Sequence, residues 1–159
     1  MCMKTLLAII MLISILVIFL FRNMQRSFPQ LEVTILFFFV SFLCQHINFK
    51  ISTAYERLFL TAEYIPRIIG FLHFGWIIPV LLVWALYRQK RAHTIWYVLG
   101  WCCLEVLSKF LFLKVGVVQC DSEWVFMIDV IMCLLIVIIS SLFQRYYDHL
   151  LKRESVAVE

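Results

Sequence analysis

Four ionisable side chains lie inside long apolar stretches of the sequence, where charge is costly: His73, Glu105, Lys109 and Asp129. A charge in hydrocarbon costs roughly 2.5–3.5 kcal/mol on insertion scales, so such residues usually face the interior of a helix bundle and pair. Glu105 precedes Lys109 by four residues, a spacing that brings both side chains onto one helix face. The pattern predicts a buried polar cluster in which Lys109 neutralises one or both carboxylates and His73 adds a group that titrates near neutral pH.

The cluster has three interpretations that the sequence alone leaves open. Paired charges can hold the helices of a membrane bundle in register, which is a structural role. The same residues can line a transport pathway or a ligand site. In the third interpretation the side chains reach the membrane surface separately and never meet.

Other chemistry has little support in the sequence. It contains no HExxH, no GxSxG and no glycine-rich phosphate loop. The cysteines form no CxxC pair and no zinc-type Cys/His spacing; they are Cys2, Cys44, Cys102, Cys103, Cys120 and Cys133. We therefore expect no catalytic residue, no metal site, no cofactor and no enzymatic activity.

The composition indicates that most of the chain is surrounded by lipid. Of 159 residues, 64% are hydrophobic and 15% are charged, whereas soluble domains have roughly 45–50% apolar residues and about 25% charged residues. The net charge of +4 is small and scattered, so nucleic acid is not an expected partner. The expected partners are the lipid bilayer and another membrane protein or a second copy of the chain.

The apolar residues fall in five blocks, each close to the 17–25 residues that a helix needs to cross a bilayer. The blocks are residues 5–21, 33–49, 68–87, 94–113 and 124–143. They are apolar on every face, which excludes the alternating pattern of barrel strands. The predicted fold is all-α: a single domain, residues 1–159, forming an integral membrane bundle of five transmembrane helices. The count falls to four if the second block, which ends in polar residues, does not span.

The sequence also predicts the form of one linker and a kink in one helix. Residues 50–66 have helical spacing of apolar side chains with charges off that stripe, which predicts an amphipathic linker helix ended by Pro66. Pro79 has no N–H for the carbonyl of Gly75, so the third helix is expected to kink just after His73.

Orientation follows from the basic residues between the blocks. With five spans, one side carries five: Lys4, Lys50, Arg57, Arg67 and Lys114. The other side carries eight: Arg22, Arg26, Arg88, Lys90, Arg91, Arg145, Lys152 and Arg153. The positive-inside rule then places the N-terminus outside the cell membrane, the C-terminus in the cytoplasm and the polar cluster in the outer leaflet. With four spans the counts hardly differ.

Four sequence stretches carry a resemblance to a known group of proteins. They are FRNMQRSF after the first block, GFLHFGWIIPVLLVWALYRQKR, LEVLSKFLF, and the final helix from Trp124 to RYYDHLLK. In their order they resemble uncharacterised small multi-pass membrane proteins of spore-forming Gram-positive bacteria, with a departure at CDSEWVF. The resemblance covers most of the chain and implies membrane helices without a known activity, so it transfers no functional residue.

Two functions remain in view. The first is a non-enzymatic accessory or structural membrane subunit, because the chain has almost no soluble part. The second is a small transporter or proton-coupled permease component that uses the polar cluster.

Overall fold

The computed structural model describes residues 3–47, 58–60, 63–92, 94–120 and 124–157. Within these ranges the protein is all-α apart from one short ribbon of two strands. The elements are α1 (Met3–Ser27), α2 (Gln30–Gln45), β1 (Leu58–Leu60), α4 (Tyr64–Leu72), the π-helical segment η2 (His73–Ile77), α5 (Ile78–Ala92), α6 (Trp96–Val115), β2 (Val118–Cys120) and α7 (Trp124–Ala157).

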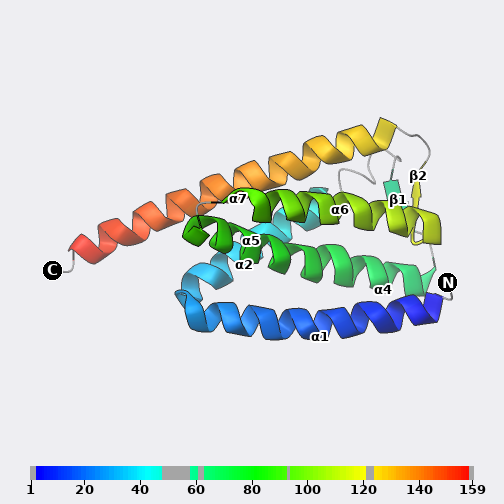
Figure 1. Ribbon diagram of the computed structural model, residues 1–159, viewed down its shortest axis with the longest axis horizontal. Coiled ribbons are helices and arrows are strands. Elements are labelled where there is room, and N and C mark those ends of the chain that lie inside the picture. Colours follow the sequence, from blue (N-terminus) through cyan, green and yellow to red (C-terminus); the bar gives the residue numbers. More distant parts are fainter. Residues whose placement is uncertain (1–2, 48–57, 61–62, 93, 121–123, 158–159) are drawn as a thin grey trace.

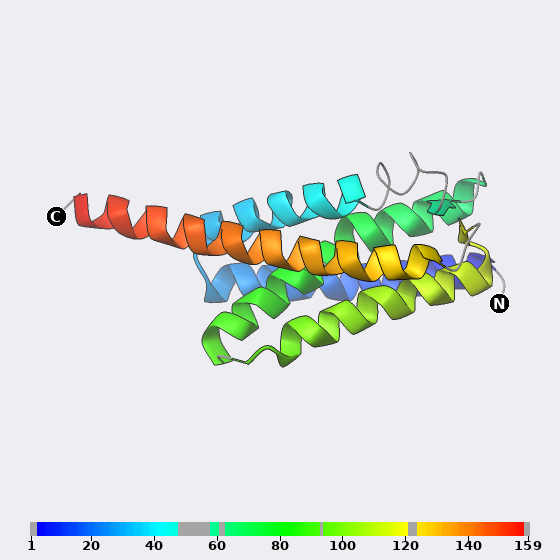
Figure 2. The same cartoon turned by 90° about the horizontal axis from the view of Figure 1, so that it is seen from above.

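The long helices lie along one axis and alternate in direction, so that the two termini are at opposite ends of the molecule (Figures 1 and 2). The α4, η2 and α5 segments follow one another as one long helix. Helix α1 packs against α4, and α2 packs against α5 and α7. Helix α6 packs against both α5 and α7. Apolar side chains from all these helices form one continuous core.

Among the described residues, three helices are long and apolar enough to cross a membrane, namely Met3–Ser27, Tyr64–Ala92 and Val130–Leu151. Large apolar side chains on α1 point away from the bundle, with Leu12 63% and Phe19 64% exposed. Such a surface would aggregate in water and suits lipid. The structure thus confirms the all-α prediction and the membrane-helix character of the chain.

Several helices differ in length from the sequence prediction. The last helix has 34 residues and extends well beyond residue 143, so it is about 51 Å long at 1.5 Å per residue. A bilayer core is only about 30 Å thick. Part of α7 therefore continues past the core when the helix crosses a membrane. Helix α6 ends at Val115. The next residue, Gly116, has a φ of 81°, which lies in the left-handed region that favours glycine.

The linker prediction for residues 50–66 was wrong in its described part. Residues 58–60 form β1, which pairs antiparallel with β2 through Leu58 and Cys120 at one end and Leu60 and Val118 at the other. The two segments leave their helices at the same end of the bundle, and pairing satisfies their backbone groups. Pro66 does not precede the third helix but lies in the first turn of α4, where its missing N–H has no intrahelical partner to lose. Residues 50–57 and 61–62 of the linker lie outside the described residues.

A π-helical segment, η2, lies directly before the residues at which the sequence predicts a kink. The N–H of Ile78 donates to the carbonyl of His73, the five-residue step of a π-helix. Pro79 cannot donate to the Gly75 carbonyl, and the hydroxyl of Ser41 on α2 donates to it instead at 2.9 Å. A side chain of a neighbouring helix thus replaces the backbone bond that proline removes.

Candidate functional site: a buried polar cluster

An ion pair lies buried on α6, as the four-residue spacing predicts. The ammonium Nζ of Lys109 is 2.9 Å from Oε1 of Glu105. The two side chains are only 3% and 1% exposed. Both charges therefore lie in the low-dielectric interior of the bundle, where removal of either one would leave the other buried without compensation.

His73 joins the cluster from η2 through a serine of α6. Its Nε2 lies 2.8 Å from the hydroxyl oxygen of Ser108, and that hydroxyl donates to the main-chain carbonyl of Glu105 at 2.8 Å. Because the serine proton is used in this way, we assign the imidazole proton to Nε2, which donates to Ser108. Nδ1 then carries a buried lone pair, and it has no hydrogen-bond partner among the described residues.

Aromatic rings enclose the cluster. The His73 ring meets Phe112 edge-on at 4.7 Å between centroids and Phe74 at 5.0 Å. Lys109 Nζ lies 5.7 Å from the centroid of the Phe74 ring, within cation–π range. This shell keeps the local dielectric low and so strengthens the electrostatic contacts inside it.

The same face of α6 carries the contacts that attach it to its neighbours. Trp101 donates from Nε1 to the carbonyl of Ile78 at 3.0 Å, just after η2. The free thiols of Cys102 on α6 and Cys133 on α7 lie close enough to interact with each other. Phe112 and Trp101 are both buried, so this face of α6 points into the bundle.

The structure brings together three of the four predicted polar residues: His73, Glu105 and Lys109. The side chain of Asp129 on α7 lies outside the described residues, so its place in the cluster stays a prediction. Pro79 follows the π-helical segment that carries His73.

A second polar group lies elsewhere in the bundle, and sequence reasoning missed it. Lys90 on α5 pairs with Asp148 on α7 at 2.6 Å and reaches Glu32 on α2 at 3.7 Å. Burial and the neighbouring Asp148 carboxylate raise the pKa of Glu32, while its contacts with Tyr87 and Lys90 act in the opposite direction. The three charged residues belong to three helices far apart in sequence, so no local spacing could have indicated their contact.

The chemistry open to the cluster is narrow. Among the described residues, no group of three or more His, Cys, Asp or Glu side chains is placed to hold a metal ion. The arrangement offers an ion pair and one basic imidazole nitrogen inside an apolar shell. It can hold helices in register, or it can accept and release a proton.

Comparison of the chain with protein-family models, with curated proteins and with solved structures gives no match. The geometry of the chain itself therefore carries the functional argument.

Proposed function

We propose that the chain is a non-enzymatic, multi-pass membrane protein that serves as an accessory or structural subunit in a cell membrane. The observation that carries the proposal is the Glu105–Lys109 pair, which is almost fully buried and is enclosed by aromatic rings. A charge pair closed in this way supports a fixed helix arrangement better than it supports exchange with solvent. Helices make up most of the residues that the structure describes, which supports a structural role.

The proposed topology has five crossings, with the N-terminus outside and the C-terminus in the cytoplasm. It rests on the alternating helix directions, on the opposite positions of the termini (Figure 1) and on the eight basic residues of the C-terminal side. The short helix α2 and the charged helix α6 would then cross together with the three long apolar helices. Single cysteines introduced as Lys114→Cys and Arg26→Cys should react with an impermeant reagent from outside and inside, respectively. Labelling of both from one side would refute the topology.

The subunit role is tested by purifying the full chain from the membranes of expressing cells in a mild detergent. We expect a partner membrane protein in fixed stoichiometry, or a defined oligomer of the chain, and no ion flux from the pure protein in liposomes. The complex should be weakened by Lys109→Met, which disturbs the bundle, and unaffected by Lys114→Met at an exposed position of the same helix. A monodisperse monomer without partner would refute the role.

The His73 environment favours a second candidate, a small transporter or proton-coupled permease component. The observation is the buried Nδ1, which has no hydrogen-bond partner in the described part of the chain and lies on a π-helical segment, a distortion that is frequent at functional sites. An imidazole nitrogen with a free lone pair can accept and release a proton. Liposome flux that depends on pH and is lost in Glu105→Gln and His73→Phe would establish this candidate in place of the first.

A further inference from the structure

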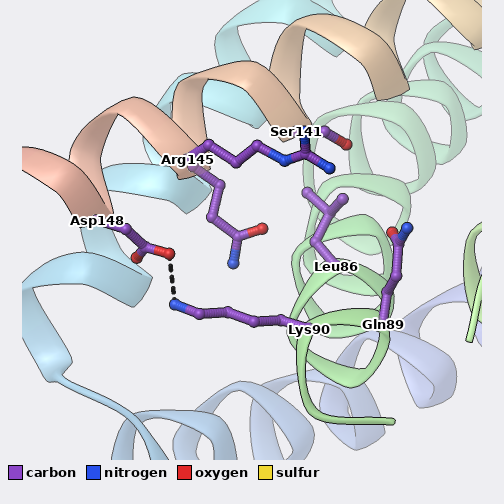
Figure 3. Close-up of a pocket in the computed structure, with 7 residues that line it drawn as sticks. Leu86, Gln89, Lys90, Ser141, Arg145 and Asp148 are labelled. Atoms are coloured by element: carbon purple, nitrogen blue, oxygen red, sulfur yellow. Dashed lines mark ion pairs between the residues drawn. The ribbon is translucent and has the colours of Figure 1, made fainter. Parts of the chain in front are cut away.

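A cavity of about 360 Å³ lies between α5 and α7 and does not include the His73 cluster. Its lining combines one leucine with polar and charged side chains: Leu86, Gln89, Lys90, Ser141, Gln144, Arg145 and Asp148 (Figure 3). The volume is within the range of roughly 300–1,000 Å³ that is usual for small-molecule sites.

Within the described residues, not every charged side chain in this cavity has an ion-pair partner. Lys90 is neutralised by Asp148 at 2.6 Å and by Glu32 at 3.7 Å, as the ion pair drawn in Figure 3 shows for Asp148. Arg145 forms no ion pair within the part of the chain that the structure describes. It lies beside Ser141 on the α7 wall of the cavity (Figure 3). The cavity therefore presents one guanidinium group that is free to bind an anion.

Gln144 supplies the second, independent observation. The residue is only 7% exposed, yet it lines the cavity and its amide Nε2 has no hydrogen-bond partner among the described residues. Buried polar groups are normally hydrogen-bonded. Within the described residues, the cavity is thus lined by a buried amide donor and a guanidinium that both lack a partner, which indicates a ligand that accepts hydrogen bonds and carries negative charge.

We propose that this cavity binds the phosphate group of a phospholipid headgroup. The guanidinium of Arg145 matches two phosphate oxygens at once, and the Gln144 amide and the Ser141 hydroxyl can donate to the oxygens that remain.

The surroundings favour a lipid over a soluble phosphate ester. The cavity lies between two helices that are apolar enough to cross a membrane. On α7, Ile138 and Leu142 are 53% and 59% exposed, one to two turns before Arg145. An acyl chain can lie along this apolar surface while its headgroup occupies the cavity. Arg145 also belongs to the basic side of the chain, where headgroups of a cytoplasmic leaflet are expected.

The test uses the full-length protein in a neutral detergent, titrated with phosphatidylglycerol and observed by native mass spectrometry. We expect saturable binding of one lipid per chain. Arg145→Ala and Gln144→Leu should each weaken binding about tenfold or more, because each removes donors to the phosphate. Arg26→Ala is the matched control, since it removes an exposed arginine on α1 that lines neither this cavity nor the smaller one near α1.

Competition separates the possible sources of the phosphate. Glycerol 1-phosphate and inorganic phosphate should fail to displace the lipid at equal concentration, and diacylglycerol, which lacks phosphate, should not bind. Displacement by either soluble phosphate at equal concentration would overturn the lipid assignment. Equal loss of binding in Arg26→Ala, or unchanged binding in Arg145→Ala, would overturn the site. Arg145→Lys, which keeps the charge on the same helix, should restore part of the affinity and guards against a folding defect.

Discussion

Loss of one partner of the Glu105–Lys109 pair gives the most decisive test of the bundle. At 2.9 Å and an effective dielectric constant of about 20, the attraction between the two charges is about 6 kcal/mol before desolvation is subtracted. Breaking a buried pair typically costs about 3–5 kcal/mol, because one charge remains buried. We therefore expect Lys109→Met and Glu105→Gln each to lower the free energy of unfolding by about 3–5 kcal/mol.

The double variant carries the stronger prediction. With Glu105→Gln and Lys109→Met combined, no charge is left in the apolar shell, and replacing a buried pair by neutral groups is often neutral or stabilising. The double variant should lie within about 1 kcal/mol of the wild type, which gives a coupling energy of several kcal/mol in a double-mutant cycle.

The assay is reversible unfolding in mixed detergent micelles, followed by the fluorescence of tryptophan and by helical circular dichroism. Lys114→Met, an exposed lysine on the same helix, is the control and should change stability by less than about 1 kcal/mol. Additive effects in the double variant, or single variants as mild as the control, would refute the reasoning that the pair is buried and coupled.

Three further predictions concern other contacts. Ser41→Ala should lower the free energy of unfolding by about 1 kcal/mol in the wild type, because it leaves a partly buried carbonyl without a donor, and by less in a Pro79→Ala background, where the backbone N–H returns. A mild oxidant should link Cys102 to Cys133 within one chain, since their free thiols lie close together on adjacent helices, as measured by mass spectrometry of the digested protein. Because burial raises the pKa of Glu32, the folded state holds this proton more tightly than the unfolded state. Stability should therefore fall as the pH rises above the ordinary value of 4.5, and Glu32→Gln should remove this fall in unfolding experiments.

A specific result would contradict each of these three predictions. An equal effect of Ser41→Ala in both backgrounds would mean that the hydroxyl does not replace the backbone bond. A cross-link through the exposed Cys103 in place of Cys102 would indicate a different rotation of α6. A pH dependence that Glu32→Gln leaves unchanged would assign it to another group.

The spacing of residues along the sequence was enough to predict the helices and one ion pair. The apolar blocks predict helices because a backbone in lipid must satisfy its own hydrogen bonds. The step from Glu105 to Lys109 predicts an ion pair because both residues share one helix and one face. These conclusions need only the geometry of a single helix, so they could be drawn without any knowledge of packing.

Only the tertiary structure decided which helices meet and at what rotation. The contact of His73 with Ser108, the replacement of a backbone bond by Ser41, and the meeting of Lys90 with Asp148 each join separate helices. Helix rotation and tilt in a bundle follow from the fit of many side chains at once, which no spacing within one segment encodes. For the same reason the sequence identified the solvent and one ion pair, whereas the cavity between α5 and α7 emerged only from their packing.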